Sequence, residues 1–298
     1  MKRKANLLSL KKKIMTKKAL FIQPGKLGDL VVTTPIAKYY YDKGYEVHWP
    51  VFDNFINYFD AFEYVNSFTL DASMASHVYY RNQRVDSAAP HVFINTGRRF
   101  FKNLNQWIIN QENKEEFEIV DFCFTFPGHT NDYNNGLTKT FIEDGKNWID
   151  LKYHLAEVPL VDRWKYKWQH NEEKENKLLE FIKNYSKKKY GSEEYSIVHS
   201  YRGGKPLKKI NVKNPINFSY INGYEIYDWY KVLKNAQSII CVDSCLSHFV
   251  EVIPEFNDIE KHYLGSEEAH FHSYMRNILL NNWVNHSSSD ISYGGLIL

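Results

Sequence analysis

The sequence predicts an α/β protein of two domains, each built around a parallel β-sheet. Short apolar runs typical of buried strands are each followed by a turn of glycine or small residues and then a helix, and both halves of the chain show this alternation. The 298 residues suffice for two domains with a core each, and 43% hydrophobic with 24% charged residues is typical of a globular protein. We therefore expect twin Rossmann-like domains.

The first domain begins with a strand, a tight turn, a helix and a second strand. The apolar run 19–22 predicts a buried strand, which the turn 24–28 ends. A helix is expected at 29–43, stopped by Gly44, and a second strand at 46–51. This order is typical of a right-handed βαβ unit in a parallel sheet.

The rest of the first domain shows weaker patterns. Strands are expected at 64–69 and 91–95, whereas 117–126 is apolar but ambiguous and 127–132 is a loop. We place the domain boundary just before Pro159. The predicted divisions are a basic flexible extension at 1–16, a first domain at 17–157 and a second at 158–298.

The second domain begins with a strongly charged amphipathic helix at 172–189, with Leu178, Leu179, Phe181 and Ile182 on its apolar side. The elements after it alternate: strands at 195–199 and 216–221, a helix at 226–236, a strand at 238–242 and a helix at 246–252. The helix at 226–236 carries Trp229, Val232 and Leu233 on one face. The run at 238–242 has the clearest pattern of a buried strand in the chain.

Charge and cysteine content limit the partners and the compartment. The net charge is +3, and the basic residues gather at the N-terminus, at 2–4, 11–13 and 17–18. This stretch lacks the apolar core of a signal peptide; it is either a disordered extension or a contact for an anionic membrane surface or a nucleic acid. No apolar run reaches the roughly 18 residues of a membrane span. The three cysteines have no zinc-type spacing, which favours a cytoplasmic protein.

The turn after the first strand is the first candidate site. Gly25 and Gly28 allow a tight turn and close approach of a ligand to the backbone, and Lys26 is suited to an anionic ligand. The spacing is neither a dinucleotide fingerprint nor a P-loop. Asp29 has two interpretations from spacing alone: a first-turn carboxylate favoured by the helix dipole, or a general base that takes a proton from an acceptor hydroxyl.

Two further candidates lie in the second domain. After the strand at 238–242, Asp243 and Ser244 open a helix whose amides could bind a phosphate; the alternative is plain N-capping, and His248 one turn later has the position of a structural histidine. The loop 199–205 carries Arg202 and Lys205 beside two glycines. It is either a site that stabilises a departing diphosphate or an exposed basic loop.

These motifs together resemble the heptosyltransferase family of GT-B glycosyltransferases. The segment 26–35 is similar to the family's Gly-Asp-x-x-x-Thr-x-Pro opening, and 243–248 is similar to its Asp-Ser/Thr-Gly-x-x-His turn, with Cys245 in place of the glycine. The resemblance implies two Rossmann-like domains facing across a cleft, an acceptor domain at 17–157 and a donor domain at 158–298. The middle of the first domain, about 55–150, matches no family motif, so the acceptor stays open.

The resemblance also implies roles for single residues. Asp29 becomes the leading candidate for the catalytic base, with Lys26 and Gly28 on the acceptor side. Tyr224 precedes the predicted helix at 226–236 and is expected, from that position, to lie near the nucleotide base. The residues expected to bind the donor are Ser200, Arg202, Lys205, Tyr224, Asp243, Ser244, Cys245, Leu246 and His248.

The expected reaction is transfer of a sugar from a nucleotide diphosphate sugar, similar to ADP-heptose, to a hydroxyl of a glycan or glycolipid. The mechanism would invert the anomeric centre in one displacement, with no cofactor beyond the nucleotide-sugar co-substrate. No Asp-x-Asp pair occurs, which favours metal independence. The location would be cytoplasmic or peripheral to the membrane. Rival functions are glycosylation of modified DNA bases, non-catalytic binding of a nucleotide sugar, and a related sugar epimerase.

Overall fold

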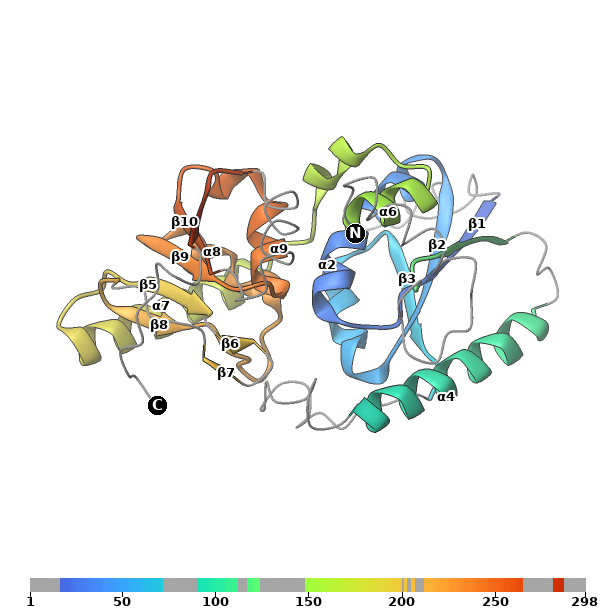
Figure 1. Ribbon diagram of the computed structural model, residues 1–298, viewed down its shortest axis with the longest axis horizontal. Helices are drawn as coiled ribbons and strands as arrows, with labels where there is room; N and C mark the ends of the chain where they lie inside the picture. Colours follow the sequence, from blue (N-terminus) through green and yellow to red (C-terminus); the bar gives the residue numbers. More distant parts are fainter. Residues whose placement is uncertain are drawn as a thin grey trace, which may run out of the picture. The chain divides into compact units, whose positions relative to one another are not determined.

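The computed structural model describes residues 17–71, 90–111, 117–123, 148–199, 201–202, 205–206, 212–264 and 281–286, with the backbone alone at 90–98, 201, 202, 205 and 206. These residues form two compact units (Figure 1). Of the described residues, the first unit holds 17–71 and 92–167, and the second holds 90–91 and everything from Trp168 on. The predicted flexible extension, 1–16, lies outside the described residues.

The first unit is built on a parallel four-stranded sheet in the order β3-β2-β1-β4. Its strands are β1 (Lys17–Ile22), β2 (Tyr45–Val51), β3 (Val65–Thr69) and β4 (Phe117–Asp121). The helices are α2 (Leu27–Asp42), α4 (Pro90–Ile109) and α6 (Trp148–Leu155), with 3-10 helices η1 (Asp53–Ala61) and η4 (Leu160–Lys165). The central strand β1 pairs with β2 through Ala19↔Val47 and with β4 through Leu20↔Ile119. Ala19, Leu20 and Phe21 are buried, as in a strand covered on both faces.

Aromatic side chains fill much of this first core. The ring of Phe21 lies 5.2 Å from Tyr40, 5.3 Å from Trp49 and 5.4 Å from Phe122, measured between ring centroids. The buried Trp49 also donates its indole N–H to the Gln23 carbonyl at 2.9 Å, so its polar atom is satisfied. The high aromatic content of the first domain is therefore largely core packing.

The second unit has a parallel five-stranded sheet in the order β11-β10-β9-β5-β8 and a separate antiparallel pair, β6-β7. Its strands are β5 (Ser196–His199), β6 (Tyr201–Arg202), β7 (Lys205–Pro206), β8 (Pro215–Asn217), β9 (Ser238–Cys241), β10 (Glu260–Leu264) and β11 (Trp283–His286). Its helices are α7 (Glu172–Tyr190), α8 (Tyr230–Lys234) and α9 (Cys245–Glu251), with 3-10 helices η5 (Ile226–Trp229) and η6 (Pro254–Phe256). The middle strand β9 is buried at all four residues, as expected for a central parallel strand.

Most predicted elements are confirmed, with shifts at their ends. The helix predicted from residue 29 begins two residues earlier, at Leu27, and the ambiguous run 117–126 contains β4. Gly44 ends α2 with a φ of +89°, a conformation that glycine adopts freely. The helix predicted at 226–236 is η5 followed by α8, and Trp229, Val232 and Leu233 are buried as expected.

Three predictions are wrong. The strand expected at 91–95 lies inside α4, because an apolar run of that length also suits a helix, and this helix buries Phe100 and Leu104, four residues apart on one face. Phe181 is 57% exposed, because the buried face of α7 consists of Glu175, Leu178, Ile182 and Ser186. The strand expected at 216–221 has only the three residues of β8, and Tyr220 beyond it is exposed.

The segment from Pro159 to Lys167 packs on the first unit, whereas the predicted domain boundary precedes it. The hydroxyl of Tyr166 is 2.9 Å from that of Tyr58, and Tyr64 donates its hydroxyl to the Lys167 carbonyl at 2.8 Å. The structure therefore divides between Lys167 and Trp168.

Candidate functional site

The turn that joins β1 to α2 is held rigidly by its own hydrogen bonds. Gln23 is 2% exposed and donates its side-chain amide to the Gly25 carbonyl at 2.8 Å, while the Pro24 carbonyl accepts the Phe52 N–H at 2.7 Å. A Cβ on Gly25 would lie 2.7 Å from Phe55 Cε2 and 2.9 Å from Phe52 Cδ2. Gly25 is therefore needed for the close packing of the turn against η1.

We expect Gly25→Ala to lower the free energy of unfolding by about 1–3 kcal/mol, because the added methyl overpacks two buried rings. Urea unfolding followed by circular dichroism measures the loss. The double variant with Phe55→Leu, which removes the nearest ring atom, should recover part of it. A Gly25→Ala protein as stable as the parent would contradict the steric argument.

Lys26 occupies the N-cap position of α2 with φ 63° and ψ 106°, outside the regions that non-glycine residues prefer. Its carbonyl accepts the Leu30 N–H at 3.1 Å, and no side chain caps this end of α2. Lys26 is exposed, and Gly28 is half-buried in the first turn. The two predicted acceptor-side residues thus lie where a helix start presents backbone N–H groups.

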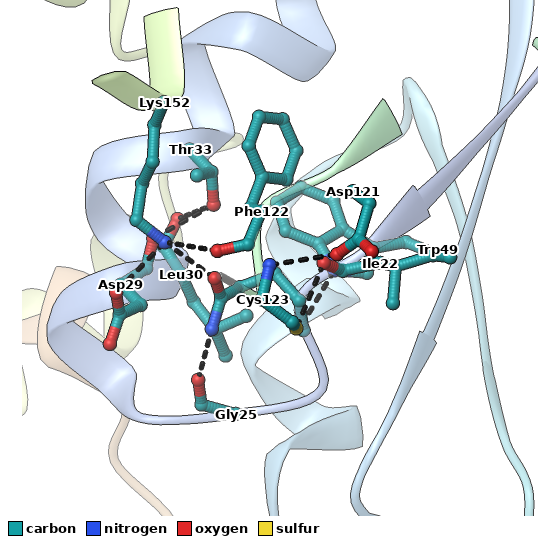
Figure 2. Close-up of polar contacts among 11 residues, drawn as sticks. Ile22, Gly25, Asp29, Leu30, Thr33, Trp49, Asp121, Phe122, Cys123 and Lys152 are labelled. Carbon is teal, nitrogen blue, oxygen red and sulfur yellow. Dashed lines mark hydrogen bonds and ion pairs between the residues drawn. The ribbon is translucent and has the colours of Figure 1, made fainter. Parts of the chain in front are cut away.

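Asp29 lies in the first turn of α2 and forms an ion pair that the sequence did not predict. Its Oδ1 is 2.9 Å from Nζ of Lys152 in α6, and the side chains are 23% and 2% exposed, respectively (Figure 2). The Asp29 carbonyl accepts the Thr33 hydroxyl at 2.8 Å. The carboxylate does not cap α2, but it lies in the first turn, where the helix dipole favours it, as one of its two interpretations predicted.

Cys123, just after β4, lies in a buried environment that disfavours the thiolate form. Its thiol is buried and donates to the Ile22 carbonyl at 3.1 Å, and burial raises its pKa well above the ordinary value. Cys241 is likewise buried with a raised pKa, and burial raises the pKa of Cys245 to about 12. All three cysteines are free thiols.

The second turn, between β9 and α9, is organised by Ser244. Its backbone N–H donates to Ser247 Oγ at 3.1 Å, and Ser247 Oγ donates to the Ser244 carbonyl at 2.8 Å. Ser244 Oγ lies 2.9 Å from Nδ1 of His199, at the end of β5. Ser244 is thus the N-cap of α9, and its hydroxyl also ties the turn to β5.

His199 is a neutral histidine that the sequence did not single out. Burial lowers its pKa to about 4, well below the ordinary value of about 6.5. At neutral pH one ring nitrogen therefore carries a proton and the other accepts one. The residue could have been suspected because it is the first residue of the predicted donor loop 199–205.

The other predicted residues of this turn lie around Ser244. Asp243 Oδ1 is 3.4 Å from Nε2 of the buried His248, so the carboxylate has a histidine beside it. Cys245 begins α9 without adopting a positive φ, so the backbone here does not need the glycine that the family motif carries. Leu246 is buried in the first turn of α9.

The remaining predicted donor residues are described less fully. Arg202 and Lys205 face each other in the register of the β6-β7 pair, which places both on one short hairpin. Ser200 lies outside the described residues. Tyr224 is half-buried in the turn before η5, and its N–H donates to the Ile221 carbonyl at 3.0 Å.

Within the described ranges, no group of three or more His, Cys, Asp or Glu side chains is placed to hold a metal ion. The helices of the same ranges include none with the length and apolar content of a membrane span.

Comparison with solved structures identifies the fold. The structure is similar to the crystal structure of the glycosyl transferase family 9 from Veillonella parvula DSM 2008, with 8% sequence identity, 93% of this chain and 87% of that chain covered, and a TM-score of 0.52. The chain has the fold of a family 9 glycosyltransferase. The predicted GT-B class of α/β fold is thereby confirmed, and the facing of the two domains across a cleft stays a prediction.

Two further structures show weaker likeness to this family 9 fold. The E. coli heptosyltransferase WaaC with ADP has 10% identity and a TM-score of 0.45, and its complex with ADP-2-deoxy-2-fluoro heptose has 11% identity and a TM-score of 0.42. Each alignment covers 92% of this chain and 96% of that chain. No family model and no curated protein sequence matches the chain. The assignment of the fold therefore rests on the Veillonella structure.

Proposed function

We propose that the protein is an inverting glycosyltransferase that moves a sugar from a nucleotide diphosphate sugar, similar to ADP-heptose, to a hydroxyl of a glycan or glycolipid. One observation carries the proposal: in a family 9 glycosyltransferase fold, the partly exposed carboxylate of Asp29 lies in the turn of helix that follows β1, with a buried ammonium on one of its oxygens. The acceptor is assigned to the first unit and the donor to the second.

The chemistry assigned to Asp29 is removal of a proton from the acceptor hydroxyl. The acceptor oxygen attacks the anomeric carbon as the bond from that carbon to the diphosphate oxygen breaks, so the centre inverts in one step. The proton passes to the carboxylate and the bonding electrons leave with the nucleotide diphosphate. A general base must be ionised and within reach of the hydroxyl, and a carboxylate 23% exposed satisfies the access requirement.

Charge on the leaving diphosphate is assigned to groups of the second unit. The backbone N–H groups of Cys245 and Leu246 begin α9, and Arg202 and Lys205 share the β6-β7 hairpin. Asp243 Oδ1 lies 3.4 Å from His248 Nε2, so this side chain is assigned no direct contact with the phosphates. These groups support a mechanism without a metal ion.

The test is a thermal-shift panel of ADP-, GDP- and UDP-sugars, followed by transfer assays with the donor that binds. A donor at 100 times its Kd adds about 2.7 kcal/mol of stability, which corresponds to a rise in Tm of roughly 5–10 °C. We expect that rise with ADP-sugars and undiminished transfer in EDTA. A rise without transfer or hydrolysis would indicate a non-catalytic binder, and no rise with any donor would refute the proposal.

A further inference from the structure

Lys152 is a buried cation whose partners are spread over separate elements of the first unit. Its Nζ is 2.9 Å from Asp29 Oδ1, 2.5 Å from Gln23 Oε1 and 3.4 Å from the Phe122 carbonyl (Figure 2). Its ammonium also lies over the rings of Trp148 and Phe122, 5.4 Å and 5.7 Å from their centroids. The lysine thus joins the end of β1, the start of α2 and the end of β4.

Such a group is costly to keep in a fold. An ammonium taken out of water loses hydration free energy that its partners must compensate, and hydrophobic residues of the same volume often make a protein equally stable. The side chain of Lys152 is 2% exposed, so nearly all of this cost applies. Stability alone is therefore a weak reason for a lysine at this position.

Lys152 contacts the Asp29 carboxylate from the protein interior and not from the solvent. Asp29 is 23% exposed although its partner is 2% exposed, so part of the Asp29 side chain reaches solvent. In Figure 2 the ammonium reaches one carboxylate oxygen, and the other oxygen points away from it. The ion pair therefore fixes Oδ1 and leaves Oδ2 on the side of the carboxylate away from Lys152.

The helix that carries Lys152 is fixed to the helix that carries Asp29. Tyr153, which is buried, donates its hydroxyl to the Val32 carbonyl at 3.3 Å, one turn of α2 beyond Asp29. Gln23 completes the support, since its amide N–H is bound to the Gly25 carbonyl and its amide oxygen therefore points to Lys152. The position of the ammonium relative to the carboxylate is thus set by packing and by hydrogen bonds on both sides.

From these contacts we propose that Lys152 is the positioning residue of the catalytic base: it holds Oδ1 of Asp29 and directs Oδ2 toward the acceptor hydroxyl. This inference rests on the proposed function. Lys152 itself does not touch the reacting atoms.

The first test is Lys152→Met, which keeps the length of the side chain and removes the ammonium. We expect kcat to fall by about 10- to 100-fold, the range for a misplaced catalytic group, with the KM for the donor unchanged. The substitution leaves the other groups around this cluster unchanged, namely Lys26, Asp121 and the Cys123 thiol.

Lys261→Met is the matched control. Lys261 is also buried, at 0% exposure, but its Nζ donates to the Phe256 carbonyl at 3.0 Å in the second unit. Its replacement should lower stability without changing kcat. If Lys152→Met does not fold, Lys152→Gln serves instead, because it keeps an N–H donor without the charge, and it should lower kcat less than Lys152→Met does.

The decisive comparison adds Asp29→Asn. If Lys152 acts through Asp29, the double variant Asp29→Asn/Lys152→Met has the kcat of Asp29→Asn alone. Losses that multiply, or a Lys152→Met enzyme with the kcat of the parent, would overturn the positioning role while leaving the proposed function intact. A parent protein that transfers no sugar would overturn both.

Discussion

Asp29→Asn is expected to lower kcat by about 10²- to 10⁴-fold, the range for loss of a general base. The amide cannot accept the proton of the acceptor hydroxyl at neutral pH, whereas its oxygen can still accept a hydrogen bond from Lys152, 2.9 Å from the carboxylate in the parent. Donor binding is assigned to the second unit, so the thermal shift with nucleotide sugar should stay within error of the parent. The loss should appear in kcat and not in the KM for the donor.

The matched control for this variant lies on the same helix. Asp42 is the last residue of α2 and pairs with Lys38, but its side chain is 54% exposed. Asp42→Asn removes the same charge from a lysine-paired carboxylate and should leave kcat unchanged. Near-normal turnover by Asp29→Asn, measured by single-turnover transfer of labelled sugar, would rule out Asp29 as the base.

Acidification is expected to destabilise the second unit through His199. Its pKa is about 4 in the folded protein and about 6.5 when exposed, so below pH 6.5 the unfolded chain binds a proton that the folded protein does not. Stability is then lost as the pH falls from about 6.5 to about 4, by about 1.4 kcal/mol per pH unit and about 3 kcal/mol in total. Protonation would also disturb the contact between His199 Nδ1 and Ser244 Oγ.

Urea unfolding between pH 7 and pH 4.5 measures this effect against His199→Asn. Asparagine does not titrate and can still form a hydrogen bond with Ser244 Oγ. The free energy of unfolding is plotted against pH for each protein, and the difference between the two slopes gives the proton bound by His199 alone. We expect the slope of the variant to be smaller by about 1.4 kcal/mol per pH unit. Equal slopes would show that His199 titrates normally in the folded protein.

Local patterns sufficed for the elements that carry the predicted chemistry. The run at 19–22, the glycines after it and the apolar helix beyond predict β1, its turn and α2, because such a unit buries its apolar residues with little help from distant parts of the chain. The same holds for β9, Ser244 and α9. Asp29 and Ser244 could therefore be named as candidates from their places at two helix starts.

Distant contacts decided what local patterns left open. Phe181 resembles its neighbours Leu178 and Ile182 in sequence, yet it is exposed because the second unit covers the other side of α7. The run at 91–95 suits a strand or a helix, and the choice depends on the whole length of α4. No strand was predicted at 260–264 or 283–286, where the structure has β10 and β11; β10 pairs with β9, and β11 extends the sheet by pairing with β10.

The sequence by itself determined the two parallel-sheet units, the two turns after β1 and β9, and the candidacy of Asp29. Only the tertiary structure decided how that carboxylate is held. Lys152 lies 129 residues from Gln23 along the chain, in a short helix whose sequence is not clearly amphipathic, and the two meet because α6 packs on α2. A buried ion pair depends on positions brought together by folding, and no spacing within a single segment predicts it.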